Sequence, residues 1–329
     1  MRRLYISTLF CILLVSSYSL ATNKDQIYKN NFLENKIYSS KSKEFVNKNN
    51  FYKILSDYDI IYLAETHNNS QQHDIQSDVI NKLIKMGLNP SVGFEFFSND
   101  DTGYLMNFVE NISYYKSMSD GGINLRQQLG WEKKDDILWN YYFELILLAG
   151  ANGLKIFGLD IPKALNVRIR GSGMERISEF ERLLLNFTGY SDPVFKEYLL
   201  EQFTIAHSGW SEAGLLERLY DTWVARNDTM AISITNIINT TEGTLVVIIG
   251  KGHTAYNMGV YNIVEKMNPA VKQINVGFTE TNSNHEDLQY YTKELIIKGN
   301  SYGMSYDFLW FTRAQNLMDN TSSNLSVNE

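Results

Sequence analysis

The sequence has a single cysteine and only four prolines among its 329 residues. The cysteine lies in the N-terminal stretch MRRLYISTLFCILLVSSYSLATNKD, where two arginines precede an apolar run that ends in Ser19-Leu20-Ala21. This arrangement is typical of a secretory signal peptide, so residues 1–21 are expected to be removed after Ala21. The remaining chain would then contain no cysteine, which excludes disulfide bonds and thiolate chemistry.

The sequence also lacks an excess of positive charge. Its 30 lysines and arginines are outnumbered by 37 aspartates and glutamates, which gives a formal net charge of −7. A nucleic-acid binder needs a basic face to neutralise phosphates, so nucleic acid is not an expected partner. No second stretch is apolar and long enough to predict a membrane span. The 44% apolar and 20% charged residues are typical of a globular protein.

Five short apolar runs predict an α/β fold. Each run is apolar on consecutive residues and amphipathic segments separate them, which indicates a mainly parallel sheet with helices on both faces. The first connecting segment supports this, because apolar residues recur at helical spacing between Ser70, a predicted cap, and Gly87, a predicted end. The five runs are residues 59–64, 91–97, 154–160, 244–250 and 272–278.

The other segments complete the predicted domain organisation. Residues 22–50 form a polar lead-in, and residues 51–315 form one α/β domain. Helical insertions are predicted at about residues 103–150 and 163–240, because these connections exceed ordinary loop lengths and carry helical patterns.

The C-terminal region is predicted to extend the sheet. The aromatic segment 301–315 is expected to form an antiparallel edge pair with residues 290–297. Residues 316–329 are polar, and we expect a disordered tail there.

Polar residues recur at the ends of the predicted strands. The working residues of an open parallel sheet gather at the carboxyl ends of its strands. Here Glu65 and His67 follow the first run, Glu95 lies within the second, Asp160 closes the third and His253 follows the fourth.

Each of these residues also has a purely structural interpretation. A carboxylate after a strand, such as Glu65 or Asp160, often caps a helix or forms a turn. A charge within a strand, at Glu95, must be paired, protonated or functional unless that strand lies at a sheet edge. The alternative interpretation of His253 is a histidine with only a structural role. The alternative interpretation of His73 is a surface residue or a residue that contacts the site from outside it.

An arginine stands in the middle of a predicted apolar helix stripe. Apolar residues recur every three or four positions over residues 215–238, and Arg226 occupies one of these positions. A buried guanidinium requires a carboxylate, which Glu65, Glu95 or Asp160 could supply. The structural alternative is a buried salt bridge that ties the helical insertion to the sheet.

The predicted cluster is compatible with two chemistries. Carboxylates and histidines hold a divalent metal or act as a general base on water, while an arginine stabilises an oxyanion. No HExxH, zinc-ribbon, GxSxG or P-loop pattern decides between them. Asp228 lies off the apolar stripe and is expected to form a cap or to contact the loop after the fourth strand. The cluster comprises Glu65, His67, Glu95, Arg226 and His253, of which all but Arg226 are the candidate metal ligands.

As a set, these motifs resemble the ChaN-like family of haem-binding uptake proteins, which is grouped with the erythromycin esterases and the Tiki-type metalloproteases. The similarity covers about residues 50–280, in matching order and approximate spacing. The motifs are YLAETHNNSQQHDIQ, SVGFEFF, GLKIFGLDIP, WVARNDTMA and VVIIGKGHT.

The resemblance implies roles for individual residues. One departure is Ala64, which stands where the family usually has a glycine before the first glutamate. Glu65 and His67 match the acidic-x-histidine motif, Glu95 the glutamate of the next strand, Arg226 and Asp228 the Arg-x-Asp pair, and His253 the closing Gly-x-Gly-His.

The resemblance further implies that the protein binds haem and acts in haem or iron uptake. None of the matched motifs identifies the residue that binds the haem iron. Cys11 lacks the small residues that precede a lipid-attachment site, so a soluble periplasmic form is expected, or one associated with the outer membrane. Two further partners are expected: a second copy of the chain, which would share a haem surface in a homodimer, and an outer-membrane haem receptor.

The alternative function is a hydrolase, of esterase or metal-dependent type, in which the cluster activates water. The third interpretation is a protein whose polar cluster only holds the fold together.

Overall fold

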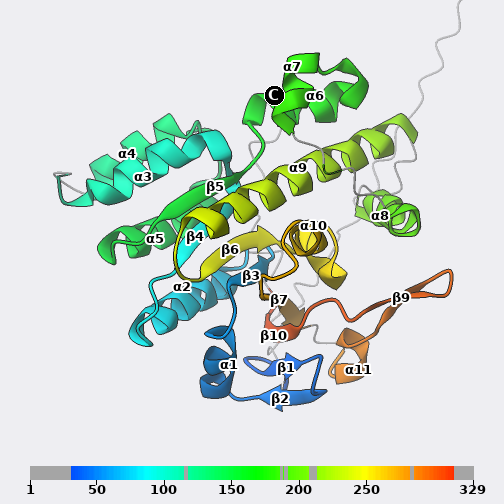
Figure 1. Ribbon diagram of the computed structural model, residues 1–329. Coiled ribbons are helices and arrows are strands. Elements are labelled where there is room, and N and C mark those ends of the chain that lie inside the picture. The colour runs from blue at the N-terminus through cyan, green and yellow to red at the C-terminus, as the bar shows by residue number, and fades with distance from the viewer. Residues whose placement is uncertain are drawn as a thin grey trace, which may run out of the picture.

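A mostly parallel sheet forms the centre of the computed structural model (Figure 1), which describes residues 31–314 except 115–117, 186–187, 189–191, 207–212 and 282–284. Its strands are β1 (Ile37–Ser39), β2 (Glu44–Val46), β3 (Ile60–Glu65), β4 (Ser91–Ser98), β5 (Ile156–Asp160), β6 (Leu245–Gly250), β7 (Gln273–Thr281) and β10 (Phe308–Arg313). They lie in the order β2-β1-β10-β7-β3-β6-β4-β5. The strands from β10 to β5 are parallel, while β1 and β2 are antiparallel additions.

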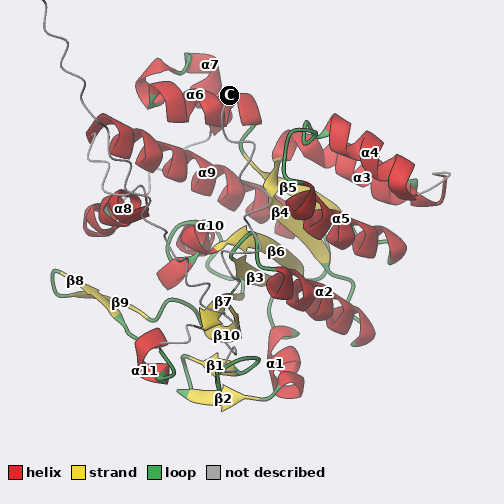
Figure 2. Ribbon diagram, turned by 180° about the vertical axis from the view of Figure 1, so that it is seen from behind, coloured by secondary structure: helices red, strands yellow, loops and turns green. Residues whose placement is uncertain are grey.

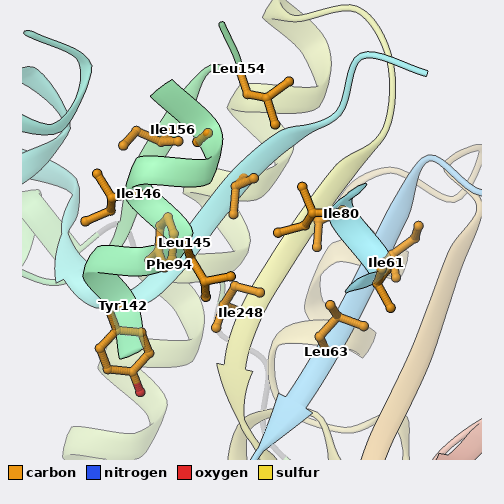
Figure 3. Packing of buried hydrophobic residues seen from close by; sticks show 14 of the residues in the cluster. Ile61, Leu63, Ile80, Phe94, Tyr142, Leu145, Ile146, Leu154, Ile156 and Ile248 are labelled. Carbon is orange, nitrogen blue, oxygen red and sulfur yellow. The ribbon is translucent and has the colours of Figure 1, made fainter. Parts of the chain in front are cut away.

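Helices cover both faces of the sheet, as predicted (Figure 2). Successive residues of β3 point to opposite faces, so Ile61 and Leu63 join one core while Ile60 and Tyr62 join the other. Figure 3 shows part of the first core. That core is completed by α1 (Lys48–Leu55), α2 (Ser70–Lys85), α3 (Thr102–Glu110), α4 (Met118–Gln128) and α5 (Asp136–Ala151), and the second by α9 (Ala213–Thr240) and α10 (Val260–Met267).

The long connections carry helices, as their sequence patterns predict. The first insertion supplies α3, α4 and α5, and the second ends in the long helix α9. Three helices of the second insertion pack on α9: α6 (Lys163–Ser172), α7 (Glu179–Leu185) and α8 (Pro193–Ala206). Short 3-10 turns are Asn99–Asp101, Ile112–Tyr114, Met174–Arg176, Lys251–His253 and Ala255–Asn257.

All five predicted strands are present, but one predicted cap is wrong. The cap of α2 is Asn69, whose side chain accepts a hydrogen bond of 3.3 Å from the backbone N–H of Gln72. Ser70 is already the first helical residue. Gly87 follows the helix with a φ of 86°, a left-handed conformation that glycine adopts without strain.

The prediction of an antiparallel edge pair at the C-terminal end is wrong for the aromatic segment. Strand β10 lies inside the sheet, parallel to β7 and paired with β1 on its other side. Its Phe308 and Trp310 join one core while Leu309 and Phe311 join the other, so both faces of the strand are buried. Part of the predicted pairing does form, because β8 (Leu295–Ile297) and β9 (Asn300–Gly303) pair antiparallel in a separate two-stranded sheet that follows α11 (Leu288–Tyr291).

The N-terminal lead-in is more ordered than its polar composition suggests. Residues 37–39 and 44–46 of the segment 22–50 form β1 and β2, and α1 begins at Lys48. The predicted signal peptide and the tail 316–329 lie outside the described residues. Within the described ranges, no helix has the length and apolar character of a membrane span.

Candidate active and ligand-binding site

The ends of β3, β4 and β6 bring the predicted carboxylates to one edge of the sheet. Glu65 ends β3 directly opposite Gly250, which ends β6. The pairing of β4 with β5 shifts register between Phe94 and Ser98, and Glu95 lies within this irregular stretch. Bulges of this kind redirect side chains and are frequent beside active sites. Because β4 lies between β5 and β6, Glu95 is not on an edge strand and its charge must be compensated within the fold.

Arg226 supplies that compensation by binding two carboxylates at once. Its Nη2 donates to Glu95 Oε1 at 2.8 Å, and its Nε donates to Asp160 Oδ2 at 2.8 Å. The prediction that a strand-end carboxylate pairs with Arg226 therefore agrees with the geometry for Glu95 and Asp160, whereas Glu65 makes no such pair. The arginine side chain keeps 22% of its surface exposed, so it is still accessible from the cavity described below.

His253 completes this ion-pair group. Its Nε2 lies 3.1 Å from Glu95 Oε1, and its Nδ1 lies 2.9 Å from Asn227 Oδ1. Asn227 is held in turn, because its Nδ2 donates to the backbone carbonyl of Trp223 at 2.7 Å. Each ring nitrogen of His253 therefore faces an oxygen acceptor, which fixes the orientation of the imidazole.

Electrostatic coupling within the group favours its charged forms. Burial opposes ionisation of Glu95, but His253 and Arg226 outweigh it and hold the pKa of Glu95 well below its usual range. Asp160 differs, because burial dominates over the attraction of Arg226 and raises the pKa of this carboxyl. The pKa of Arg226 is raised by Glu95 and Asp160 despite its own burial.

A second group is built on Glu65. His67 Nδ1 lies 3.3 Å from Glu65 Oε1, the same oxygen that accepts a hydrogen bond of 2.5 Å from the Tyr142 hydroxyl. Gln76 Nε2 donates to Glu65 Oε2. Figure 3 shows Tyr142 at one edge of the apolar core, with its hydroxyl directed away from the labelled side chains. The buried carboxylate is thus satisfied by three side chains from different elements.

His67 presents its other ring nitrogen without a hydrogen-bond partner among the described residues. Half of its side chain is exposed, while the ring edge packs against Phe96 at 4.8 Å between centroids. Burial disfavours the imidazolium, but the hydrogen bond with Glu65 and the charges of Glu95 and Glu65 together raise the pKa of His67. A carboxylate on one ring nitrogen fixes the ring and makes the other nitrogen a better base or metal ligand.

Gly250 lies between the two groups, in contact with both Glu95 and His67. Its N–H donates to Glu95 Oε2 at 2.5 Å. A methyl group at this position would lie 2.6 Å from His67 Cε1 and 3.2 Å from Glu95 Oε2. A larger residue here would therefore force the His67 ring to move.

Of the remaining predicted residues, His73 also belongs to the Glu65 group, since its Nδ1 lies 3.5 Å from Glu65 Oε2. His73 places Nε2 2.9 Å from the carbonyl of His67 and Nδ1 3.0 Å from Gln76, so it orders the loop that carries His67. Asp228 accepts from the hydroxyl of Thr188 at 2.6 Å and from its backbone N–H. The predicted contact of Asp228 with the loop after the fourth strand is not present in the described residues.

A cavity of about 680 Å³ lies over both groups and is bounded by the second helical insertion. We call its base, formed by Glu65, His67, Glu95, Arg226 and His253, the polar floor. The opposite wall is largely aromatic and apolar. That wall consists of Phe195, Tyr198, Leu199 and Phe203 from α8, Leu219 and Trp223 from α9, and Tyr256. An apolar wall with a few convergent polar groups is the usual form of a small-molecule site.

Tyr256 has a strained backbone at the cavity wall. Its φ of 60° lies in the left-handed region, which non-glycine residues seldom adopt, and Asn257 follows with a φ of 54°. The conformation is held by the backbone N–H of Tyr256, which donates to the carbonyl of Ser305 at 2.7 Å. Strain of this kind is concentrated at functional sites.

Sequence reasoning did not identify Tyr142, Gln76 or Asn227 as members of the site. The feature of the sequence that could have pointed to Asn227 is its position next to Arg226 on the same helix. Gln76 had another such feature, because it ends the matched motif YLAETHNNSQQHDIQ. Tyr142 had none, since it lies 77 residues from Glu65, in the interior of α5.

The cluster does not have the form of a metal centre. In the ranges that the structure describes, no group of three or more His, Cys, Asp or Glu side chains is arranged to hold a metal ion. The predicted divalent-metal site at Glu65, His67, Glu95 and His253 is not supported.

Comparison with known proteins decides the family. Residues 51–264 match the family model described as "Haem-binding uptake, Tiki superfamily, ChaN". The chain belongs to the ChaN family. A search of curated proteins gives no match.

One solved structure agrees with the ChaN-family assignment at the level of the fold. The structure of cofacial haem binding to ChaN of Campylobacter jejuni is 16% identical, with a TM-score of 0.61, and the match covers 83% of this ChaN-family chain and 95% of that one. A Bacillus cereus protein matches at 14% identity and a TM-score of 0.45, and the match covers 82% of this chain and 92% of that one. An erythromycin esterase, EreC, in its open conformation matches at 11% identity and a TM-score of 0.40, and the match covers 74% of this chain and 77% of that one.

Proposed function

We propose that the protein binds haem in the cavity above the polar floor and acts in haem or iron uptake. Family membership supports this ligand class, and the cavity supports it physically. Its volume lies within the range of roughly 300–1,000 Å³ typical of small-molecule sites. Aromatic side chains on its wall offer a large apolar surface to a porphyrin, and the polar floor offers donors and a candidate iron ligand.

The observation that carries the proposal is the pairing of His67 with Glu65. Histidine is a common axial ligand of haem iron, and metal-ligating histidines usually donate their second ring N–H to a carboxylate or carbonyl. His67 has that arrangement and lines the cavity. Tyr198 also lines it, but burial and the hydrogen bond with Tyr256 raise the pKa of Tyr198, which disfavours the phenolate that a tyrosine ligand requires. We therefore propose that His67 would supply the ligand to the haem iron.

A haem titration of the purified protein tests the proposal. We expect a saturable, stoichiometric change of the Soret band, and we expect His67→Ala to weaken binding and to change the ligand-field spectrum. His285→Ala is the matched control, because His285 stacks on Tyr290 and does not line the cavity. Weak, unsaturable partitioning like that of a protein that does not bind haem would refute haem binding. An unchanged spectrum in His67→Ala would refute the ligand assignment alone.

A metal-independent hydrolase is the second candidate, and the same histidine favours it. A carboxylate-oriented imidazole beside a cavity is the arrangement of a general base, and Arg226 could stabilise an oxyanion from the other side of the polar floor. Glu95 is a poor base here, because Gly250, Arg226 and His253 already occupy its oxygens. Hydrolysis of activated carboxylic esters that disappears in His67→Ala, with the Soret change absent in the wild type, would favour this function.

We further propose that the protein is exported and cleaved after Ala21, as its N-terminal pattern predicts. The mature protein would then begin at Thr22, and mass spectrometry of the protein recovered from the periplasm tests this. A homodimer formed on haem addition, and capture of haem from an outer-membrane receptor, are the partners we propose. Light scattering with and without haem tests the first of these.

A further inference from the structure

Helix α8 forms much of the apolar wall of the cavity, but its described side chains join neither of the two cores that flank the sheet. Its buried residues Phe195 and Leu199, which line the cavity, belong to a small separate cluster with Tyr220 and Met258. An element that packs only on a small satellite cluster opens at a lower free energy than the core does. The position of α8 therefore depends on the contacts that hold this helix from outside the cavity.

The hairpin of β8 and β9 supplies such contacts. It projects from the molecule on the same side as α8 in both ribbon views (Figures 1 and 2). Successive side chains of a strand alternate in direction, so Leu295 and Ile297 pack into the cluster of α8 while Ile296 is 64% exposed. On β9, the ring of Tyr302 packs against that of Phe195, with 5.3 Å between the centroids. The hairpin thus supports α8, although neither of its strands lines the cavity.

One polar contact joins β9 to the start of α8. The Tyr302 hydroxyl donates to the carboxylate of Asp192, at 3.1 Å from Oδ1 and 3.0 Å from Oδ2. Asp192 Oδ1 also accepts from the backbone N–H groups of Val194 at 3.0 Å and Phe195 at 2.9 Å, so it caps the helix. The same carboxylate therefore begins α8 and ties it to the hairpin. We call the contact between Tyr302 and Asp192 the latch.

The hairpin also makes an ion pair with α8, and this pair is the weaker tie. Lys298 Nζ lies 2.5 Å from Glu197 Oε2, but these side chains are 61% and 58% exposed. Exposed ion pairs contribute little to stability, because water screens them and both side chains lose freedom. The latch is partly buried, and a hydrogen bond to a carboxylate is stronger than one between neutral groups. Loss of the latch should therefore release α8 more than loss of the ion pair.

We propose that Tyr302 is a positioning residue of the cavity, which holds α8 closed through Asp192 and so limits the rates at which the ligand enters and leaves. This inference rests on the proposed haem binding, and it places the control of ligand exchange away from the polar floor. When the latch breaks, α8 moves outward and the apolar wall opens. Because the latch acts on α8 with and without ligand, breaking it speeds entry and release alike and leaves the affinity unchanged.

The test uses the full chain as the wild type, Tyr302→Phe, Asp192→Ser and the double variant. Serine keeps an oxygen that caps the helix but is one carbon shorter than aspartate, so only the latch is lost. Tyr290→Phe is the matched control, because the Tyr290 hydroxyl makes no hydrogen bond with a described residue and Tyr290 does not line the cavity. Circular dichroism confirms that each protein is folded.

Two measurements report on the latch. Hydrogen exchange of the α8 amides, followed by mass spectrometry, reads the opening of the helix without any ligand. Stopped-flow absorbance reads the association of monomeric haem and its release to an excess of an apoglobin. In Tyr302→Phe, we expect α8 exchange, haem association and haem release each to become about tenfold faster, since a hydrogen bond to a charged group is lost. The Kd and the spectrum of bound haem are expected to stay as in the wild type.

The other variants show whether the two residues act through one contact. Asp192→Ser is expected to match Tyr302→Phe, and the double variant is expected to exceed neither, because each change breaks the same latch. Tyr290→Phe is expected to match the wild type. Single-variant effects that add in the double variant would overturn the inference.

Two further results would also overturn it. One is α8 exchange in Tyr302→Phe that equals that of Tyr290→Phe. The other is faster release with unchanged association, since the weaker affinity would then show that Tyr302 shapes the bound state and does not gate it. A wild type that binds no haem refutes the proposed function and the control of haem exchange with it. Exchange of the α8 amides still shows in that case whether Tyr302 holds the helix.

Discussion

His67 Nδ1 lies 3.3 Å from Glu65 Oε1, and Glu65 is in turn fixed by Tyr142 and Gln76. The exposed ring of His67 is therefore oriented by a carboxylate that is almost completely buried. Three elements, β3, α2 and α5, must pack correctly before His67 is placed in the cavity. The stability of the core and the chemistry of the site are coupled through this one carboxylate.

Replacing Tyr142 by phenylalanine tests that coupling. The ring still stacks on Phe96, whose centroid lies 4.2 Å away, but Glu65 loses one donor. We expect a loss of about 1–3 kcal/mol in the free energy of unfolding, the typical cost of an unsatisfied buried group. Urea denaturation measures it. Tyr104→Phe, at an exposed position on α3, is the control, and equal stabilities of the two variants would contradict the prediction.

Removing Arg226 is expected to destabilise the protein more strongly. Arg226→Met leaves Glu95 and Asp160 buried without their shared counter-ion. Breaking a buried pair from one side typically costs about 3–5 kcal/mol. Lys196→Ala removes the more exposed ion pair with Glu217 and is expected to cost about 1 kcal/mol or less. Similar urea midpoints for the two variants would show that the Arg226 pairs contribute little.

Gly250→Ala is expected to displace His67 without unfolding the protein. The added methyl group overlaps His67 Cε1, and the half-exposed His67 ring can move into the cavity. Gly103→Ala is the control, because a methyl group there has no atom within 4 Å and Gly103 does not line the cavity. Haem affinity is expected to fall in the first variant only. Equal Soret titrations of the two variants would show that the position of His67 does not matter for binding.

The pKa of His67 predicts a pH dependence of stability. The folded-state pKa is raised above the unfolded value near 6.5. The stabilisation is therefore complete below about pH 6.5 and is lost as the pH rises through the folded pKa. The difference in the free energy of unfolding between the wild type and His67→Gln should shrink as the pH rises through the folded-state pKa of His67. Urea denaturation from pH 5 to 9 measures it, and a difference that grows with pH would have the wrong sign.

The ion-pair group was predictable from the sequence because a charged residue at a buried position of an apolar pattern must pair with an opposite charge. Arg226 in a helix stripe and Glu95 in a buried strand each require a counter-ion, so their pairing was predictable. Tyr142 and Gln76 are neutral, and neutral polar residues in helices are usually satisfied by water. Their role depends on how α2 and α5 pack over the end of β3, which no local pattern encodes.

The C-terminal strand shows a different limit. The consecutive apolar residues Phe308–Phe311 satisfy the same criterion that located the other buried strands. Proximity in sequence favoured an antiparallel partner at residues 290–297 instead. The strand is parallel to β7 because β10 begins at Phe308 beside Val276, toward the amino end of β7, and runs in the same direction as β7.

The position of β10 sets an order of assembly. Strands β1 and β2 join the sheet only through β10, although more than 260 residues separate β1 from it. Until residues 308–313 are available, β7 has an unpaired edge and the N-terminal strands have no template. Among the described strands, the last along the chain therefore recruits the first, so this sheet is completed only after residues 308–313 have paired.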